Sequence, residues 1–346
     1  MTMRRDAGLI ASFAAAIAFA PAGCGRATPG AATVVVYSAL DEEFARPVLD
    51  DYARRAGVDV LSKFDVESTK TIGLTNRIVA EAARPRCDVF WNNEILNTLR
   101  LGQKGLLAPT HPRHAADLPS TFKARDGTWY GFAARARILL VNTALVAEAD
   151  RPRGIKDLLD PRWKGQIGIA KPLFGTTATH AACLFAAWGD ERASAFFRGL
   201  KANGAQVLSG NKQVATAVGS GEIAFGLTDT DDAMGEALAG RPVAIVYPDR
   251  MPNQLGTLFI PNVLAVVKHA PHPEAAEALV DHLLSPGVEA ALAEGPSVQI
   301  PLLRSTEAAA KVETPRTVHA MPADFEAAAR IWDRVADFLE AEFAGR

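Results

Sequence analysis

Residues 165–180 read GQIGIAKPLFGTTATH and contain a strand, a short loop and the start of a helix. Isoleucines alternate with small residues at the beginning, which predicts a strand, and the Lys-Pro pair ends it. A helix is expected from about Thr176 to Trp188. The first amides of a helix lack intrahelical acceptors, so this loop offers donors to an anion or polar ligand. The alternative is that Thr176 or Thr177 only caps the helix.

The same strand–loop–helix pattern occurs three times before this stretch. Apolar or β-branched runs at residues 33–37, 58–64 and 87–91 each end in a polar loop and precede a helical pattern. The first of them reads as a strand buried on both faces of a parallel sheet. In such a sheet the loops after the strands lie along one edge, where open α/β proteins bind ligands. Each polar residue there could instead be a helix cap; the residues concerned are Ser38, Ser68, Thr69, Asn92, Asn93 and Glu94.

Two longer strands are expected at residues 133–142 and 256–267. The strand–helix pattern restarts after the first of them, so we expect both to cross between two domains. Acids at residues 228–232 precede a helix expected from Ala233; they either complement its dipole or hold a cation or a ligand amine. The apolar stripe of a closing helix, which starts at Phe325, is expected in the core. The predicted fold is α/β with two domains, residues 33–135 plus 257–346 and residues 136–256.

The N-terminus reads as an export signal. Two arginines precede an apolar run from Ala7 to Ala20, which is too short for a permanent membrane anchor. We assign residues 1–23 to a signal peptide and residues 24–32 to a tether. Gly23-Cys24 resembles a lipoprotein cleavage box, in which Cys24 would be acylated, and cleavage after Ala20 is the alternative. The expected location is the periplasm, with or without a lipid anchor on Cys24.

Composition and motifs exclude several function classes. The 346 residues carry a net charge of −2, which provides no basic field for nucleic acid. Cys87 and Cys183 fall in different predicted domains, so we expect two core thiols rather than a disulfide, and no spacing suggests zinc. The sequence contains no phosphate loop, no Gly-x-Ser-x-Gly and no His-Glu-x-x-His. We therefore expect a protein that is not an enzyme and needs no cofactor.

Several stretches together carry a family resemblance: Val36–Asp41, Asp88–Trp91, Trp129–Phe132, Asp160–Gly165, Gly175–Thr177, Gly219–Glu222, and Gly256–Leu258 with Pro261–Asn262. They resemble the extracellular solute-binding proteins of ABC importers, in the ferric-ion and 2-aminoethylphosphonate branch. The resemblance covers residues 33 to about 302. It implies a type 2 periplasmic binding protein fold, with two α/β lobes joined by two crossing strands. It also implies an ABC permease and ATPase as partners of a monomeric protein.

The resemblance further implies a set of ligand contacts in the cleft between the lobes. These are Ser38, Asp41, Thr69, Asn92, Glu94, Arg135, Thr176, Thr177 and Asp229. Family members that hold ferric ion generally use two adjacent tyrosines in the segment before the last helices. The apparent counterpart here, residues 295–302, contains none. Tyrosyl capture of ferric ion is therefore not expected.

Three hypotheses for the function follow. The leading one is a binding protein that closes over a small polar or anionic solute, such as a phosphonate, a carboxylate or a metal–anion complex, and delivers it to an importer. The second is a cleft adapted to a sterol or another lipid in transit through the periplasm, which Trp91, Phe174, Ile300 and Leu302 would favour. An enzyme on the same fold is the third.

Overall fold

The computed structural model describes residues 32–65 and 72–344. The predicted signal peptide, Cys24 and Thr69 lie outside the described residues. Strands β1 (Thr33–Ser38), β2 (Asp59–Phe64) and β3 (Val89–Asn92) are each followed by a helix, namely α1 (Glu42–Ala56), α2 (Ile72–Ala80) and α3 (Leu96–Gln103). Strand β1 pairs in parallel with both β2 and β3. The three predicted strand–helix units are therefore confirmed.

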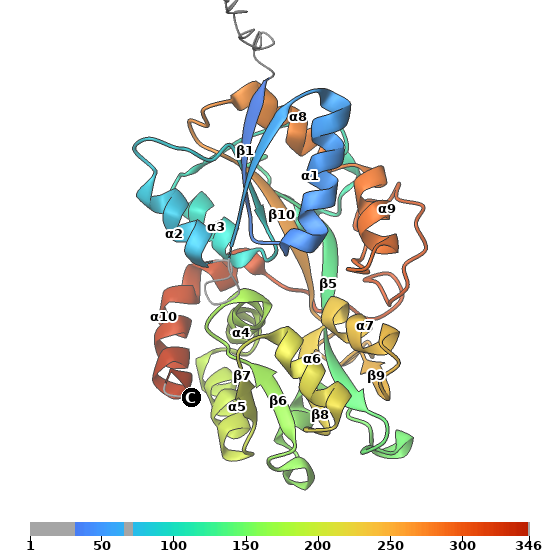
Figure 1. The fold of residues 1–346 in the computed structure, drawn as a ribbon. Coiled ribbons are helices and arrows are strands. Elements are labelled where there is room, and N and C mark those ends of the chain that lie inside the picture. Colours follow the sequence, from blue (N-terminus) through green and yellow to red (C-terminus); the bar gives the residue numbers. More distant parts are fainter. Residues whose placement is uncertain (1–31, 66–71, 345–346) are drawn as a thin grey trace, which may run out of the picture. The chain divides into compact units, whose positions relative to one another are not determined.

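Strand β5 (Tyr130–Asn142) connects two groups of strands (Figure 1). Residues 130–136 pair with the antiparallel strand β10 (Phe259–Val267), which in turn pairs with β3. Residues 137–142 pair with β8 (Phe225–Asp229) and β9 (Val243–Val246). We call β1–β4, β10 and residues 130–136 the first strand group; the rest of β5 and β6–β9 form the second strand group.

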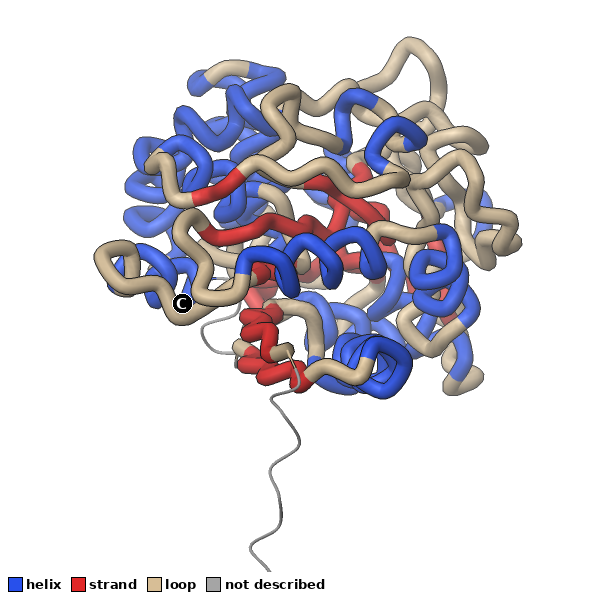
Figure 2. Tube along the Cα trace, turned by 90° about the horizontal axis from the view of Figure 1, so that it is seen from above, coloured by secondary structure: helices blue, strands red, loops and turns tan. Residues whose placement is uncertain are grey.

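The second strand group repeats the parallel arrangement. Strand β6 (Ile167–Ala170) pairs in parallel with β7 (Gln206–Leu208) and with β8. The helices of this group are α4 (Gly175–Trp188), α5 (Asp190–Ala202), α6 (Asn211–Ser220) and α7 (Thr230–Leu238). Across the described residues the strand order is β2-β1-β3-β10-β5-β8-β6-β7, and β4 (Leu107–Ala108) pairs with β10. Helices lie on both sides of the strands (Figure 2), as in other α/β folds.

The predicted start of one helix is wrong. Expected from Ala233, helix α7 begins at Thr230, because Thr228 and Asp229 continue β8 opposite β5. Residues Ile155–Leu159 form a helix of the 3₁₀ type. Only five residues are available there between Gly154 and Asp160, and short helical segments commonly adopt this tighter form.

The chain ends in helices α8 (Pro273–Leu283), α9 (Pro286–Glu294) and α10 (Phe325–Phe343). Helix α10 buries the predicted stripe against α4 and α3. Its ring contacts pair Phe338 with Phe185 of α4 and Phe343 with Phe197 of α5, at centroid distances of 5.5 and 6.3 Å. A helix assigned by sequence to the first domain thus packs on helices of the second. The two domain boundaries stay a prediction.

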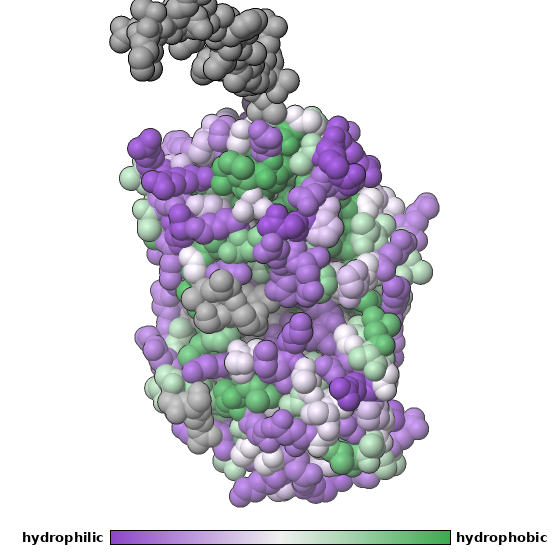
Figure 3. Space-filling model, viewed as in Figure 1, coloured by the Kyte–Doolittle hydropathy of each residue, from purple (hydrophilic) through white to green (hydrophobic). Residues whose placement is uncertain are grey.

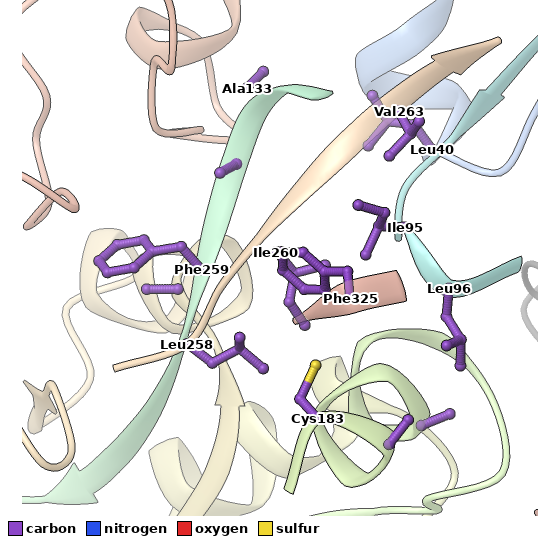
Figure 4. Packing of buried hydrophobic residues seen from close by; sticks show 14 of the residues in the cluster. Leu40, Ile95, Leu96, Ala133, Cys183, Leu258, Phe259, Ile260, Val263 and Phe325 are labelled. Carbon is purple, nitrogen blue, oxygen red and sulfur yellow. The ribbon is translucent and has the colours of Figure 1, made fainter. Parts of the chain in front are cut away.

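Helix α4 is enclosed on all sides over ten consecutive residues, Thr176 to Phe185. Figure 4 shows Leu96 of α3, Ile260 of β10 and Phe325 of α10 on the side of α4 that carries Cys183. A surface helix buries only one stripe, so α4 is an interior element held between the two strand groups. This packing fixes the position of its N-terminus.

Both cysteines of the described residues, Cys87 and Cys183, are free and buried, as the sequence predicted. Burial raises the pKa of each thiol well above its usual value. Within the described ranges, no helix combines the length and the apolar character that crossing a bilayer requires.

Candidate functional site

A polar cleft lies at the carboxyl ends of several strands, where the sequence placed it. Its cavity volume is about 60 Å³. Both strand groups contribute to its wall through the loops that lead into α1, α3, α4, α6 and α7. The lining residues are Leu40, Asp41, Asn93, Arg135, Ala170, Phe174, Gly175, Thr176, Thr177, Gly210, Asn211, Lys212, Asp229, Asp231 and Asp232.

Three helices begin at this cleft without a side-chain bond from the N-cap residue, although in the first turn of α7 the Asp232 N–H donates to Asp231 Oδ1 at 3.1 Å. The N-cap positions are Phe174 for α4, Gly210 for α6 and Asp229 for α7, and none of their side chains bonds to its own helix. Phenylalanine and glycine have no polar side-chain atom that could do so. The first turn of each helix therefore presents backbone N–H groups and the positive end of its dipole.

Beneath these helix starts lies Arg137, which is fully buried on β5. Its Nη1 donates to Asp229 Oδ1 at 2.7 Å, to Asn211 Oδ1 at 3.0 Å and to Thr176 Oγ1 at 3.2 Å. Its Nη2 donates to Thr177 Oγ1 at 3.2 Å. Because a buried guanidinium must be paired to avoid a large desolvation cost, these four side chains are held around it.

The hydroxyl protons of the two threonines are also engaged. Thr176 Oγ1 donates to Asp229 Oδ2 at 2.5 Å, and Thr177 Oγ1 donates to Asn211 Oδ1 at 3.1 Å. Asn211 Nδ2 donates to Asp229 Oδ2 at 3.0 Å. These side chains form one connected network with Arg137. Their hydroxyls are therefore less available to a solute than the neighbouring backbone amides.

Arg135, two residues earlier on β5, lines the cleft itself and is only 2% exposed. Its Nη2 donates to the carbonyl of Asn93. Its Nε makes no hydrogen bond within the described residues, and Asp231 Oδ2 lies 3.9 Å away. A nearly buried guanidinium N–H without an acceptor at the cleft wall is suited to an anionic group.

Carboxylates provide the opposite charge in the same cleft. Single oxygens of Asp229, Asp231 and Asp232 lie within 4.8 Å of one another, and Asp41 also lines the wall. Burial raises the pKa of Asp231 to about 6; Arg135 opposes the shift, and the nearby carboxylates of Asp229 and Asp41 add to it. The cleft thus combines anion-binding groups with a negatively charged region.

Of the nine predicted ligand contacts, Asp41, Arg135, Thr176, Thr177 and Asp229 line the cleft. Ser38, Asn92 and Glu94 do not; all three are fully buried beside it. Ser38 Oγ donates to the Leu40 carbonyl at 3.4 Å. Thr69 lies outside the described residues.

Glu94 is bonded to protein groups instead. Its carboxylate accepts hydrogen bonds from the backbone N–H of Leu96 at 2.6 Å and of Asn97 at 3.1 Å, and from Asn92 Nδ2 at 3.0 Å. It also accepts the hydroxyl proton of Thr179 on α4 at 2.7 Å. Glu94 therefore links the β3–α3 loop to a helix of the second strand group.

The sequence reasoning missed Arg137, Asn211 and Lys212. For Arg137, the sequence contains one indication of its role. An arginine two residues after Arg135, within an otherwise apolar buried strand, requires buried acceptors from other elements. The acceptors themselves lie 39 to 92 residues further along the chain, so their identity was not readable.

The apolar-ligand hypothesis is not supported. Of its four residues only Phe174 lines the cleft, whereas Trp91, Ile300 and Leu302 are buried in the core. In the face drawn in Figure 3, hydrophilic side chains occupy much of the middle.

Among the described residues, no tyrosine lines the cleft. The chain has four tyrosines. Tyr37 bonds to Glu81, Tyr130 to the carbonyl of Thr110, and Tyr247 accepts from the Glu313 amide. The Tyr52 ring lies 4.9 Å from the His282 ring, tilted by 40°. Each of these contacts lies away from the cleft residues.

Comparison with known proteins adds an independent line of evidence. The model of a family described as bacterial extracellular solute-binding proteins matches residues 98–328. Iron uptake protein A1 of Synechocystis sp. is 29% identical over 243 residues, 67% of this chain and 66% of that protein. The major ferric iron-binding protein of Neisseria meningitidis is 28% identical over 202 residues, 57% of this chain and 58% of that protein. The match thus spans about two thirds or less of these relatives.

Solved structures are similar over a larger share. Iron-bound HitA from Pseudomonas aeruginosa has a TM-score of 0.79 at 23% identity and covers 89% of this chain and 99% of its own. AfuA from Actinobacillus pleuropneumoniae, with fructose-6-phosphate bound, has a TM-score of 0.79 at 21% identity, covering 92% and 99%. At these identities the likeness shows the fold, which is the predicted two-lobed periplasmic binding protein fold.

Proposed function

The chain belongs to the bacterial extracellular solute-binding proteins, and from this premise we propose that it binds a small anionic solute in its cleft and delivers it to an ABC importer. The family that the sequence resembled is thereby confirmed, and its members are binding proteins rather than enzymes. The location in the periplasm, the permease and ATPase as partners, the monomeric state and the lipid on Cys24 belong to this proposal.

One observation carries the choice of an anion. Three helix N-termini meet at a cleft whose wall also holds Arg135, with a buried N–H that lacks an acceptor in the described residues. The N-cap residues of these helices make no side-chain cap bond, and only in α7 does a printed side-chain bond, from the Asp232 N–H to Asp231 Oδ1, occupy a first-turn amide. An anion at one helix N-terminus is stabilised by about 0.3 to 1 kcal/mol, and by up to about 2 kcal/mol in partly buried geometry. A phosphoryl or phosphonyl group has three oxygens, so it can accept from several helix starts at once.

The carboxylates restrict the rest of the solute. A bare phosphate ion would face Asp41, Asp231 and Asp232, whose negative charge Arg135 and Lys212 of the same cleft offset only in part. An amine or several hydroxyl groups on the solute would donate to these carboxylates. We therefore favour an organic phosphate or phosphonate that carries amine or hydroxyl groups. The fructose-6-phosphate named for AfuA belongs to this class.

Ferric ion is the second candidate. It is favoured by the iron-binding relatives and by the three carboxylates within 4.8 Å, which offer hard oxygen ligands. No tyrosine of the part of the chain that the structure describes lines the cleft to complete such a site. Iron would therefore have to enter together with an anion that supplies further oxygens, for example as a citrate complex.

A thermal-shift panel on protein refolded free of bound solute tests the proposal. Glucose against glucose 6-phosphate isolates the phosphoryl group, and ethylphosphonate against 2-aminoethylphosphonate isolates the amine. A ligand at 100 times its Kd adds about 2.7 kcal/mol to the free energy of unfolding. We expect stabilisation only by the phosphorylated or phosphonylated member of each series. Stabilisation by ferric citrate alone would favour the second candidate and contradict the first.

Solute binding is proposed to draw the two lobes together, because each lobe alone leaves half of the contacts in water. Small-angle scattering should show a smaller radius of gyration with the stabilising solute than without it. An unchanged radius would contradict the closure step while leaving binding itself intact.

A further inference from the structure

A phenylalanine occupies the N-cap position of α4, where helices favour a residue that can cap them. Serine, threonine, aspartate and asparagine are preferred at this position, because their side-chain oxygen accepts from an amide of the first turn. Other helices of the chain follow this preference, since Ser285 caps α9 and Asp324 caps α10. At α4, Phe174 makes no cap bond. The start of α4 therefore lacks a stabilising bond that α9 and α10 have.

Packing does not explain Phe174 either. The side chain is half-buried and lines the cleft, whereas the neighbouring Leu173 packs against the core. Within the described residues, Phe174 belongs neither to the core nor to the part-buried apolar residues that pack on it. Ligand pockets commonly combine such apolar or aromatic surface with a few polar groups. The ring is therefore placed to contact a solute.

The amides next to this ring have no acceptor among the groups that the structure describes. A capping oxygen at the N-cap would accept from the backbone N–H of Thr176 or Thr177. Neither of these amides, nor that of Gly175, donates to a described residue. They differ in this from the Asp232 amide in the first turn of α7, which donates to Asp231 Oδ1 at 3.1 Å. All three α4 residues line the cleft, so a solute there lies beside these amides.

Arg135 is an independent indication that this cleft takes an anion. It lines the same cleft, is 2% exposed, and its Nε lacks an acceptor in the described ranges. An anionic group can therefore accept both from Arg135 and from the first amides of α4. Because Phe174 directly precedes these amides in the chain, the carbon atoms attached to such a group would lie next to its ring.

We propose that Phe174 is a specificity-determining residue, which leaves the first amides of α4 to the anionic group of the solute and contacts the carbon chain attached to that group. The inference rests on the proposed function and narrows the class of solute. The preferred solutes are phosphonates or phosphate esters in which the first carbon atoms are apolar. A solute without such carbon atoms gains nothing from the ring.

A homologous series of phosphonates tests the contact with the carbon chain. Dissociation constants of methyl-, ethyl- and propylphosphonate are measured by calorimetry for the parent protein and for Phe174→Ala. Each added methylene should tighten binding to the parent protein by about 2- to 4-fold, because it removes apolar surface from water. In Phe174→Ala this gain should fall below about 1.5-fold for each methylene. Equal gains in the two proteins would overturn the proposed contact.

A comparison of Phe174→Ser with Phe174→Ala tests the competition for the amides. Both variants remove the ring, but only the serine hydroxyl can accept from the amide of Thr176 or Thr177. Without solute, Phe174→Ser should melt about 1 to 4 °C higher than Phe174→Ala. It should also bind methylphosphonate at least about 3-fold more weakly, because the hydroxyl occupies a donor of the anion. Equal or tighter binding by Phe174→Ser would contradict the role assigned to these amides.

Ser285→Ala is the matched control. It removes the cap of α9, where Oγ accepts from the Val288 amide at 3.4 Å, and Ser285 does not line the cleft. This variant should melt at a lower temperature and leave all three dissociation constants unchanged. If Phe174→Ala does not fold, Phe174→Leu takes its place in the comparison with Phe174→Ser, since leucine cannot cap either, and Phe174→Ser takes its place in the series.

The series also separates this inference from the proposed function. A parent protein that binds none of the three phosphonates would contradict the proposed function, and the inference with it. A parent protein that binds all three with the same affinity would leave the proposed function in place and refute the role of Phe174 alone.

Discussion

Replacing Thr179 with valine removes one hydrogen bond that joins the two strand groups. The Thr179 hydroxyl on α4 donates to Glu94 Oε2 at 2.7 Å, and its alternative acceptor is the Gly175 carbonyl at 3.3 Å. Both Thr179 and Glu94 are fully buried. Valine has nearly the shape of threonine, so the substitution removes the donor and leaves the packing in place.

The magnitude follows from the charge of the acceptor. A hydrogen bond to a charged group contributes about 1.5 to 3 kcal/mol. If the lobes separate on opening, Glu94 and Thr179 regain water, and the loss falls on the closed form alone. At about 1.4 kcal/mol for each factor of ten, the closed-to-open ratio should fall by about 10- to 150-fold.

The populations can be measured by double electron–electron resonance between spin labels at Leu61 and Leu238, which are 57% and 68% exposed and lie in different strand groups. Thr179→Val should shift the distance distribution towards the open form and speed solute dissociation. Thr216→Val is the control, because that hydroxyl donates to Glu236 at 2.9 Å within the second strand group. Identical distributions and dissociation rates for both variants would refute the reasoning.

Three predictions concern stability. Asp231→Asn should raise the free energy of unfolding by about 1 to 3 kcal/mol at pH 7, because a folded-state pKa of about 6 disfavours the charged form of Asp231. The cost of ionising Asp231 in the folded state is absent near pH 4 and complete above about pH 6. Thermal melts should therefore show that the gain in stability vanishes on acidification. Glu289→Gln should lower the free energy of unfolding by about 2 to 4 kcal/mol, because this fully buried carboxylate accepts from the amides of Ala133, Leu302 and Leu303. In urea titrations, an unchanged midpoint would contradict the role assigned to these hydrogen bonds. Gly256→Ala should cost at least about 2 kcal/mol, because φ is +92° and the added Cβ would lie 2.4 Å from the Met321 nitrogen; a stable protein with an unshifted backbone would exclude this clash.

The strands and helices were largely readable because they depend on local patterns. The β-branched run at residues 33–37 and the alternation at Ile167 and Ile169 predicted strands that the structure contains. The placement of ligand loops at one edge also followed, since parallel strands with helical connections leave no other arrangement. Five of the predicted contacts accordingly line one cleft.

The partners of the buried polar residues could not be read in this way. Glu94 follows a strand like the other predicted contacts, yet it is used to bind Thr179, which lies 85 residues away. Arg137 and Asp229 are 92 residues apart. The spacing of strands and helices in the sequence predicts which loops lie close together. Which side chains and backbone amides bond to a given acceptor depends on residues far apart in the sequence, so it can be seen only in the three-dimensional structure.

The two buried thiols make the described part of the chain unreactive towards thiol reagents under native conditions, since both cysteines are about 1% exposed. A single cysteine introduced at the exposed residue Gln213, one position beyond the cleft-lining Lys212, would therefore be the one accessible thiol among the described residues. An environment-sensitive fluorophore attached there would report solute capture optically. A biosensor could therefore be made from this fold without first replacing Cys87 or Cys183.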